Sequence, residues 1–348
     1  MGNIKNKFCG RPWDFFLVGD HYSTQCCYIH ENTGKINSPD LFDTFNNEAS
    51  KKVRKSILDG SFKYCKADIC PHIQKNELPD RDKLTGWYKD IVDNNILEVD
   101  QIPKYIHMCN DLSCNLHCPS CRIKKISTMP EERYNLFKKF QVKLLEQIKK
   151  SKKKVTINIT GSGDPFASKL YREFLFSIDG KEYPNLEIGL QTNGVMLTKS
   201  YFERLKPIWK NIRHIMVSVD AATEETYNKI RLGGNYQQVL KNIKNISLQK
   251  AVNGLDMYLE LSFIIQKENY KEMPQMVELA IQNKYTPSFY QIYKWYESKF
   301  FDDAIIFNPK HPEFKDFLNV LKNPKLKDKK INWQNMKLYY DRANEQLR

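Results

Sequence analysis

The chain has 348 residues, of which 41% are hydrophobic, so it can bury a substantial core and does not have the composition of a disordered protein. No stretch approaches the roughly 20 apolar residues that a membrane helix requires, and the basic start lacks the apolar segment of a secretory signal, so we expect a cytoplasmic protein without a membrane partner. The formal charge of +14 comes largely from short lysine runs that no recognised nucleic-acid motif accompanies, which favours solvated surfaces over nucleic-acid binding.

The first hundred residues carry short and mixed signals. The run Phe15–Val18 predicts a strand, residues 46–58 have helical spacing, and residues 60–64 predict a turn with a short strand. A polar stretch over 75–83 is the expected boundary. Five cysteines bracket these elements, namely Cys9, Cys26, Cys27, Cys65 and Cys70. The sequence therefore predicts a small cysteine-rich domain over residues 1–85, organised around metal.

From about residue 104, strand-like runs alternate with amphipathic segments of helix length. The expected strands cover 105–108, 155–160, 186–190, 212–219, 257–265 and 288–293. The expected helices between them cover 131–150, 168–178, 199–209, 224–229, 236–250 and 270–283. Because parallel neighbours need helical crossovers, this order predicts an α/β fold, a partial (β/α)6 TIM-like barrel over residues 100–295. Residues 296–348 are expected to form a C-terminal helical extension that closes the barrel.

Three cysteines, Cys114, Cys118 and Cys121, lie close together after the first expected barrel strand. Thiolate sulfur is a soft ligand that suits iron–sulfur clusters or zinc. On a four-iron cluster, three thiolates leave one iron without a protein ligand, and that iron can chelate a small molecule. A zinc loop completed by Cys109 or His117 uses the same thiols, so spacing alone leaves both possibilities open.

The spacing Cys-x3-Cys-x2-Cys resembles the signature of the radical S-adenosylmethionine (radical SAM) superfamily. The resemblance covers residues 104 to about 295 and implies a [4Fe–4S] cluster on Cys114, Cys118 and Cys121. In that family the cluster cleaves SAM to methionine and a 5′-deoxyadenosyl radical, which abstracts hydrogen from an unactivated carbon. The three cysteines are then the catalytic residues.

Further motifs follow in the family's order. Gly161-Ser-Gly-Asp-Pro165 is similar to the family's Gly-Gly-Glu-Pro segment, although Ser162 and Asp164 replace a glycine and the glutamate. Gln191-Thr-Asn-Gly194 and Ser218-Val-Asp220 resemble the ends of strands three and four, and Arg231-Leu-Gly-Gly234 resembles the family's Arg-x-Gly-Gly segment. The resemblance implies SAM contacts from Gly161, Ser162, Gly163, Asp164, Thr192, Asn193, Ser218 and Arg231. A guanidinium such as that of Arg231 can bind a carboxylate bidentately.

The N-terminal cysteines form a second constellation. Cys9-Gly-Arg-Pro-Trp13, the Cys26-Cys27 pair and the closing pair Cys65 and Cys70 are similar to the SPASM or twitch module of many radical SAM enzymes, although that module normally follows the barrel. The resemblance implies a second, auxiliary [4Fe–4S] cluster held by Cys9, Cys65, Cys70 and one of the adjacent pair. We favour Cys26, because adjacent side chains of an extended segment point opposite ways. Four thiolates also suit a structural zinc ribbon.

The resemblance implies an oxidoreductase-type enzyme that oxidises, dehydrogenates or epimerises an sp³ carbon, supplied with electrons by a flavodoxin- or ferredoxin-like donor. Because the cysteine module occupies the N-terminal hundred residues, a small, sugar-like or nucleotide-linked substrate is favoured. Modification of a peptide or protein is the alternative, and a zinc-containing nucleic-acid-binding protein without catalysis is a further one. The candidates for substrate contact are Asp111, Glu260, Tyr293 and Glu297.

Overall fold

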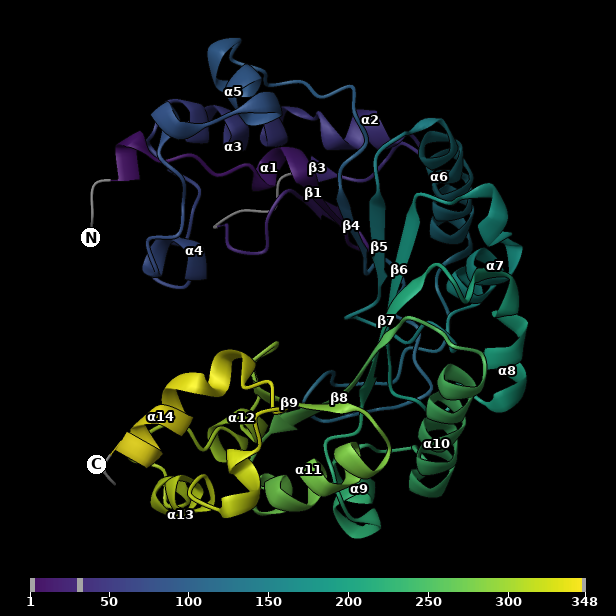
Figure 1. The fold of residues 1–348 in the computed structure, drawn as a ribbon, viewed down its shortest axis with the longest axis vertical. Coiled ribbons are helices and arrows are strands. Elements are labelled where there is room, and N and C mark those ends of the chain that lie inside the picture. Colours follow the sequence, from purple (N-terminus) through teal and green to yellow (C-terminus); the bar gives the residue numbers. More distant parts are fainter. Residues whose placement is uncertain (1–3, 30–33, 346–348) are drawn as a thin grey trace. The chain divides into compact units, whose positions relative to one another are not determined.

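The computed structural model describes residues 4–29 and 34–345, and Figure 1 shows its ribbon. Contacts along the chain divide it into two compact units. The first unit comprises Met1–Leu112, Met129–Ser162 and Ser177–Ile188, and the second comprises Ser113–Thr128, Gly163–Phe176 and Gly189–Arg348.

The first unit contains the N-terminal cysteines, the short strands that lie among them and the first strands of the βα region. Its strands are β1 (Phe15–Val18), β2 (Tyr22–Thr24), β3 (Gly34–Lys35), β4 (Tyr105–Met108), β5 (Val155–Ile159) and the start of β6 (Leu186–Thr192). Its helices are α1 (Arg11–Asp14), α2 (Leu41–Phe45), α3 (Glu48–Leu58), α4 (Pro71–Gln74), α5 (Gly86–Asp93) and α6 (Glu131–Lys150). The strand order is β3-β2-β1-β4-β5, followed by β6.

Strand β1 pairs in parallel with β4, so that Phe15 lies opposite Tyr105 and Val18 lies opposite Met108. Strands β2 and β3 add an antiparallel edge to β1. The N-terminal segment therefore extends the sheet of the first expected barrel strand. The division into domains over 1–85, 100–295 and 296–348 remains a prediction. The two compact units have other boundaries.

The second unit continues the βα alternation. Its strands are the end of β6, β7 (Ile212–Ser218), β8 (Tyr258–Ile265) and β9 (Thr286–Gln291), in that order. Its helices are α7 (Lys169–Ser177, whose last residue falls in the first unit), α8 (Lys199–Arg204), α9 (Glu224–Ile230), α10 (Tyr236–Val252), α11 (Met273–Gln282), α12 (Phe300–Ala304), α13 (Phe314–Val320) and α14 (Lys337–Glu345). Strands β7, β8 and β9 are parallel, with Ser218 opposite Ser262 and Ser262 opposite Ser288. The predicted α/β fold with a mainly parallel sheet is confirmed.

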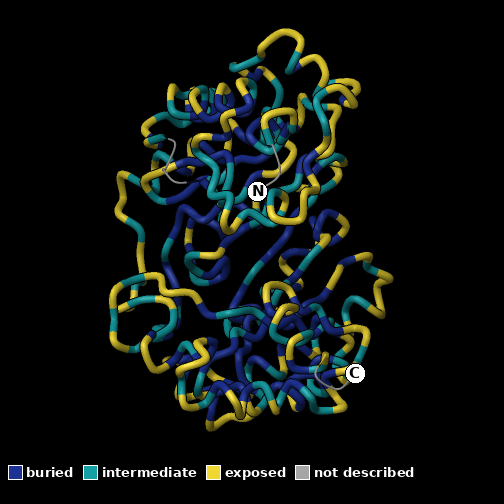
Figure 2. Tube along the Cα trace, turned by 90° about the vertical axis from the view of Figure 1, so that its left-hand side faces the viewer, coloured by how far each residue is buried: buried dark blue, intermediate teal, exposed yellow. Residues whose placement is uncertain are grey.

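Hydrophobic periodicity explains why these segments form strands and helices. In β5, Val155, Ile157 and Ile159 are buried on alternate positions, whereas α6 buries Phe137, Phe140 and further residues at helical spacing. Figure 2 shows the buried trace inside each unit and exposed positions on its outside. Within the described ranges, none of the helices combines the length and the apolar composition needed to cross a membrane.

Three of the expected elements differ in the structure. Residues 60–64 form a turn without a strand, because Phe62 has a positive φ of 49° and its amide donates to the Ser56 carbonyl. The helix expected over 199–209 ends at Arg204, and a 3₁₀ turn over Lys206–Ile208 contains Pro207. The last barrel strand begins at Thr286, two residues before the expected start.

Candidate functional site

The cysteine loop after β4 is folded by its own backbone hydrogen bonds. The amide of Cys114 donates to the Ile126 carbonyl at 2.8 Å, and the amide of Cys121 donates to the Cys118 carbonyl at 3.0 Å. The imidazole of His117 lies 2.9 Å from the Ile123 carbonyl, on the loop's own backbone. This loop therefore brings Cys114, Cys118 and Cys121 into one neighbourhood, and His117 is engaged elsewhere.

Burial and charge act together on two of the three thiols, Cys114 and Cys118. Burial, followed by the nearby Asp164 and Cys118, raises the pKa of Cys114 to about 11. Burial also raises the pKa of Cys118, and Cys121 adds to this effect. A buried thiol of raised pKa stays protonated until a cation compensates the thiolate charge. With Cys121 of the same loop, these two side chains form a soft donor set of the kind that an iron–sulfur cluster uses.

The guanidinium of Arg122 lies beside this donor set. Its Nη2 is 3.5 Å from the Sγ of Cys121. Although burial lowers the pKa of Arg122, the thiolate forms of Cys121, Cys114 and Cys118 raise it overall. Within the part of the chain that the structure describes, no three His, Cys, Asp or Glu side chains stand close enough to hold a metal ion as placed. The donor set nevertheless fits a cluster by its chemistry, because three thiols and a cation share one loop.

The carboxylate of Asp164 links the loop after β5 to the end of β6. One oxygen accepts from the Thr192 hydroxyl at 2.7 Å and from the Asn193 amide at 2.8 Å. The other oxygen accepts from the amides of Phe166 and Ala167 at 2.9 and 3.2 Å. Burial raises the pKa of Asp164 despite these four hydrogen bonds. Asp164 therefore holds two loops together, and both its oxygens are already engaged.

The turn after β6 reaches the cysteine loop. The side-chain amide of Asn193 donates to Asn115 at 2.9 Å and lies 3.6 Å from the Sγ of Cys114. The next residue, Gly194, has a φ of +78°, and a Cβ there would come within 2.7 Å of the Val217 side chain. Only glycine fits both the conformation and the space. The Thr-Asn-Gly sequence thus positions Asn193 against the first cysteine.

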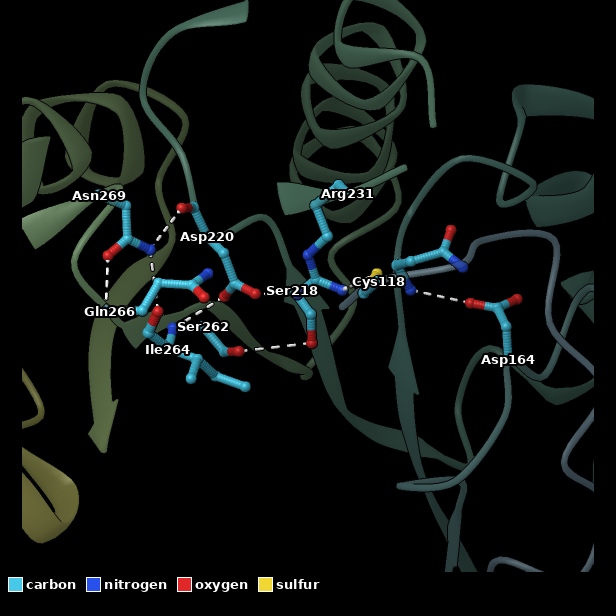
Figure 3. A network of polar contacts seen from close by, with 10 residues as sticks. Cys118, Asp164, Ser218, Asp220, Arg231, Ser262, Ile264, Gln266 and Asn269 are labelled. Carbon is cyan, nitrogen blue, oxygen red and sulfur yellow. Dashed lines mark hydrogen bonds and ion pairs between the residues drawn. The ribbon is translucent and has the colours of Figure 1, made fainter. Parts of the chain in front are cut away.

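Arg231 lies at the centre of the network in Figure 3. One of its terminal nitrogens pairs with the buried Asp220, and the other lies 3.8 Å from the Sγ of Cys118. Its Nε has no hydrogen-bond partner within the described residues. Burial lowers the pKa of Arg231, but the charge of the neighbouring Asp220 raises it overall, so the guanidinium is held charged. A carboxylate ligand would meet a cation that is already oriented.

Asp220 in turn connects the ends of β7 and β8. It accepts from the Ile264 amide at 2.8 Å, and its backbone carbonyl accepts from Asn269 at 2.8 Å. The hydroxyl of Ser262 donates to Ser218 at 3.4 Å on the same side of the strands (Figure 3). The structure thus brings Arg231, which directly follows α9, to Asp220, two residues after Ser218 at the end of β7.

Two of the predicted SAM contacts, Gly161 and Ser162, belong to the first unit, whereas Gly163 and Asp164 belong to the second. Gly161 has a φ of +122°, and a Cβ there would lie 3.3 Å from the Nε2 of His107. The hydroxyl of Ser162 lowers the pKa of Cys109, but burial outweighs it and raises that pKa to about 11. The role of Gly161 and Ser162 remains a prediction.

The N-terminal cysteines are partly brought together in the first unit. Burial raises the pKa of Cys65 to about 12, and Cys9 and Cys70 contribute to this rise, so these three thiols interact electrostatically. Cys26 and Cys27 instead hydrogen-bond to each other, an interaction that lowers the pKa of Cys27 to about 6. The Nη2 of Arg11 lies 3.5 Å from the Sγ of Cys27. The choice between Cys26 and Cys27 remains a prediction, as does the metal.

The predicted substrate candidates fall in different environments. Asp111 is buried in the first unit. Tyr293 is 53% exposed and accepts a hydrogen bond from Asn335, and the exposed Glu297 pairs with Lys294 at 2.6 Å. Glu260 is 2% exposed and forms hydrogen bonds with side chains of the neighbouring strands. The structure therefore separates Glu260 from the two surface residues.

Sequence reasoning gave no role to Arg122, Asp220 or His214. Arg122 directly follows the third cysteine, and its basic side chain beside a thiol is the signal that was available. Asp220 belongs to the Ser-Val-Asp motif at the end of β7, but its partner lies eleven positions further along. His214 gave no signal, because its partner Glu260 comes from another strand.

Comparisons with known proteins match the part of the chain that carries the cysteine loop. The profile of the radical SAM superfamily matches residues 112–280. A probable GTP 3′,8-cyclase of Methanocaldococcus jannaschii is 28% identical over 167 residues, which are 48% of this chain and 51% of that protein. A probable GTP 3′,8-cyclase of Methanococcus maripaludis is 29% identical over 122 residues, which are 35% of this chain and 37% of that protein. The chain thus matches about half or less of these curated relatives.

Two solved structures show a limited similarity. The structure of TYW1 with a lysine-pyruvate adduct bound has a TM-score of 0.37 at 16% identity, covering 60% of this chain and 68% of its own. The structure of hexahistidine-tagged anSMEcpe with bound AdoMet has a TM-score of 0.44 at 18% identity, covering 62% of this chain and 58% of its own. The family match includes all three cysteines of the loop after β4 and the strands β5 to β8. The chain is thus similar to the radical SAM superfamily over residues 112–280.

Proposed function

We propose that the chain binds a [4Fe–4S] cluster through Cys114, Cys118 and Cys121, cleaves SAM there, and abstracts hydrogen from an sp³ carbon of a small substrate. The observation that carries this proposal is that the three thiols and the Arg122 guanidinium lie in one loop, which its own backbone hydrogen bonds fold. That loop lies inside the segment that matches the superfamily. When bound, the cluster supplies the electron that splits SAM into methionine and a 5′-deoxyadenosyl radical.

The residues around the loop suit the binding and orientation of SAM. Arg231 is held charged beside Cys118, so it can receive the methionyl carboxylate while Asp220 keeps its orientation. Asn193 offers an amide close to Cys114, and Ser218 offers a hydroxyl at the neighbouring strand end. Asp164 positions this site indirectly, because its oxygens hold the Thr192-Asn193 turn.

The N-terminal thiols support a second proposal, an auxiliary [4Fe–4S] cluster on Cys9, Cys65, Cys70 and Cys26. Cys9 and Cys70 both raise the pKa of Cys65, which supports these three cysteines as ligands. Full ligation by four thiolates suits an electron acceptor better than a substrate site. Such a cluster would take the second electron of an oxidation.

A sugar-like or nucleotide-linked substrate is the class we propose. The curated relatives are named probable GTP 3′,8-cyclases, which supports a nucleotide-linked substrate. The formal charge of +14 suits a phosphorylated substrate and an acidic flavodoxin- or ferredoxin-like electron donor. Such donors would place the reaction in the cytoplasm. Peptide modification is the second candidate.

The test is the formation of 5′-deoxyadenosine and methionine from SAM by anaerobically reconstituted, dithionite-reduced protein. Cys118→Ala is expected to abolish both products, because it removes a ligand of the proposed cluster. Cys109→Ala, a buried thiol outside the three-cysteine loop, is the matched control and should retain them. Formation of neither product by the native sequence, despite a bleachable visible absorption, would rule out the SAM-cleaving function.

Metal analysis of the same preparation tests the auxiliary cluster. We expect about eight irons per chain from two four-iron clusters, falling to about four when Cys9, Cys65 and Cys70 are replaced by alanine. Zinc together with about four irons in the native sequence would contradict the auxiliary cluster and leave the SAM-cleaving site untouched.

A further inference from the structure

One face of strands β7, β8 and β9 carries a row of polar side chains. Residues at alternate positions of a strand share a face, so His214 and Ser218 of β7 lie on the same side as Glu260 and Ser262 of β8. The hydrogen bonds His214–Glu260 and Ser262–Ser218 confirm this common side. We call it the Ser218 face. The opposite side buries apolar residues such as Leu261.

Glu260 is the buried charge of the Ser218 face. Its Oε2 lies 2.8 Å from the Nε2 of His214, and its Oε1 accepts from the Tyr290 hydroxyl of β9 at 2.7 Å. Burial acts to raise the pKa of Glu260, but His214, Tyr290 and Ser288 together lower it. The carboxylate is therefore ionised and receives donors from the strands on both sides.

The ionised carboxylate fixes the proton on the imidazole. A carboxylate is only an acceptor, so the Nε2 of His214 that faces Glu260 must carry the hydrogen. In neutral histidine the other nitrogen, Nδ1, then has a free lone pair. No partner for this Nδ1 lies within the described residues. Glu260 thus fixes the orientation of the His214 ring, whose Nδ1 is an acceptor in the neutral form.

Solvent reaches the contact between His214 and Glu260, unlike a polar contact that is fully buried in the core. The side chain of His214 is 32% exposed, and the ring of Tyr258, which packs against it at 5.2 Å between centroids, is 44% exposed. Next to Glu260, the fully buried hydroxyl of Ser288 makes no hydrogen bond of ordinary geometry to the residues that the structure describes. An open acceptor and such a hydroxyl on one face are what a polar ligand requires.

We propose that His214, oriented by Glu260, forms with Ser288 the substrate subsite of the Ser218 face, and that it binds a hydroxyl or amino group. The proposal rests on the proposed function and specifies its substrate. Ser218 lies four positions after His214, about 13 Å along a strand. The substrate that joins the two positions therefore has roughly the length of a nucleoside or an amino sugar with its substituents. It donates a hydrogen bond to Nδ1, and the exposed Tyr258 ring provides an apolar surface beside it.

The test uses hydrogen transfer itself, because the substrate is not identified. The probe is a metabolite extract of cells grown in deuterated water, freed of its own SAM and added with unlabelled SAM to the reduced, reconstituted enzyme. Deuterium in 5′-deoxyadenosine, measured by mass spectrometry, reports abstraction from an extract compound. Unlabelled 5′-deoxyadenosine reports SAM cleavage without substrate.

His214→Gln keeps a nitrogen donor toward Glu260 but removes the Nδ1 acceptor. We expect at least a tenfold loss of deuterated 5′-deoxyadenosine, with the unlabelled product within twofold of the native sequence. Ser288→Ala removes a hydroxyl whose hydrogen-bonding geometry is poor, so the fold should tolerate it, and we expect a threefold to tenfold loss of the deuterated product. His21→Gln, an exposed histidine paired with Asp20, is the matched control.

The outcomes separate the subsite from the function on which it rests. If both variants transfer deuterium like the native sequence, the subsite is wrong while SAM cleavage stands. The subsite is equally wrong if the native enzyme cleaves SAM but takes no deuterium from the extract. If the native enzyme makes no 5′-deoxyadenosine at all, the proposed function fails instead. Should His214→Gln fail to fold, the Ser288→Ala result decides.

Discussion

Arg231 joins a proposed cluster ligand to a buried carboxylate through one planar group. Its two terminal nitrogens face Cys118 and Asp220, an arrangement that requires the fork geometry of a guanidinium. Lysine offers a point charge, which can stay near Asp220 but cannot also present a second nitrogen to a ligand carboxylate. This difference makes the role of Arg231 testable without removing the charge.

We expect Arg231→Lys to weaken SAM binding roughly tenfold, about the worth of one charge-assisted hydrogen bond. Equilibrium dialysis of the reconstituted protein with labelled SAM measures the dissociation constant. Lys229→Gln, which removes an exposed partner of Glu225 on the same helix, is the control and should bind SAM as the native sequence does. Unchanged affinity in Arg231→Lys would show that the guanidinium does not contact SAM.

Arg54 is a buried arginine of the first unit, and its role is structural. It is fully buried and donates to the carbonyls of Pro12, Phe45 and Leu97 and to the side chain of Asn46. Burial lowers the pKa of Arg54 to about 9, so its hydrogen bonds must compensate the lost hydration. It thereby ties α1, α2 and the segment before β4 to α3.

Arg54→Lys is expected to lower the free energy of unfolding by about 3 kcal/mol, because lysine cannot satisfy these spread acceptors. Urea denaturation followed by tryptophan fluorescence measures the change. Lys55→Met, at an exposed position of the same helix, should alter stability by less than about 0.5 kcal/mol. An unchanged unfolding midpoint for Arg54→Lys would mean that the acceptors find other donors.

At the scale of elements, Asp164 holds the β5–α7 loop against the end of β6. Its oxygens accept from backbone amides on both segments, an arrangement that a side-chain amide cannot reproduce. We expect Asp164→Asn to destabilise the protein by about 2 kcal/mol through the acceptors that it loses. It should also reduce 5′-deoxyadenosine formation, because Asn193 would no longer be fixed.

Urea denaturation and product analysis of Asp164→Asn check both effects. Asp179→Asn, at an exposed cap of a 3₁₀ turn, is the control for a general loss of acidic charge. A variant as stable as the native sequence with unchanged SAM cleavage would show that the two loops are held by other contacts.

The elements differed in how far the sequence could predict them. The run Val155–Ile159 is β-branched and alternates, and α6 keeps its apolar spacing over five turns, so local pattern was sufficient for both. Strands β2 and β3 span three and two residues, too few to show a period. That β1 pairs with β4 depends on contacts between residues ninety positions apart, which no local pattern encodes.

The candidate site shows the same division. The spacing of Cys114, Cys118 and Cys121 is local, so the loop and its soft donor set could be predicted. The ion pair of Arg231 with Asp220 and the contact of His214 with Glu260 join separate elements. Such contacts depend on the register of the parallel strands, which the sequence pattern leaves open.

At the scale of the whole molecule, the family match and the fold have different limits. The superfamily profile begins at residue 112, whereas strand β4 before it pairs with β1 of the N-terminal segment. Ile106 and Met108 of β4 are fully buried. Removal of β1 would leave the backbone donors and acceptors of β4 unpaired along one edge, and an exposed edge strand of this kind promotes aggregation.

We therefore expect a chain of residues 100–348 to be largely aggregated and to unfold without a cooperative transition. Size-exclusion chromatography and thermal unfolding by circular dichroism measure this. The control is the full chain with Cys9, Cys65 and Cys70 replaced by alanine, which loses the proposed auxiliary ligands but keeps β1. It should elute and unfold as the native sequence does and retain about four irons, because the proposed SAM-cleaving [4Fe–4S] cluster needs only the loop after β4. A monomeric, cooperatively unfolding 100–348 chain would instead show that the radical SAM domain folds independently, as the predicted boundary near residue 100 implies.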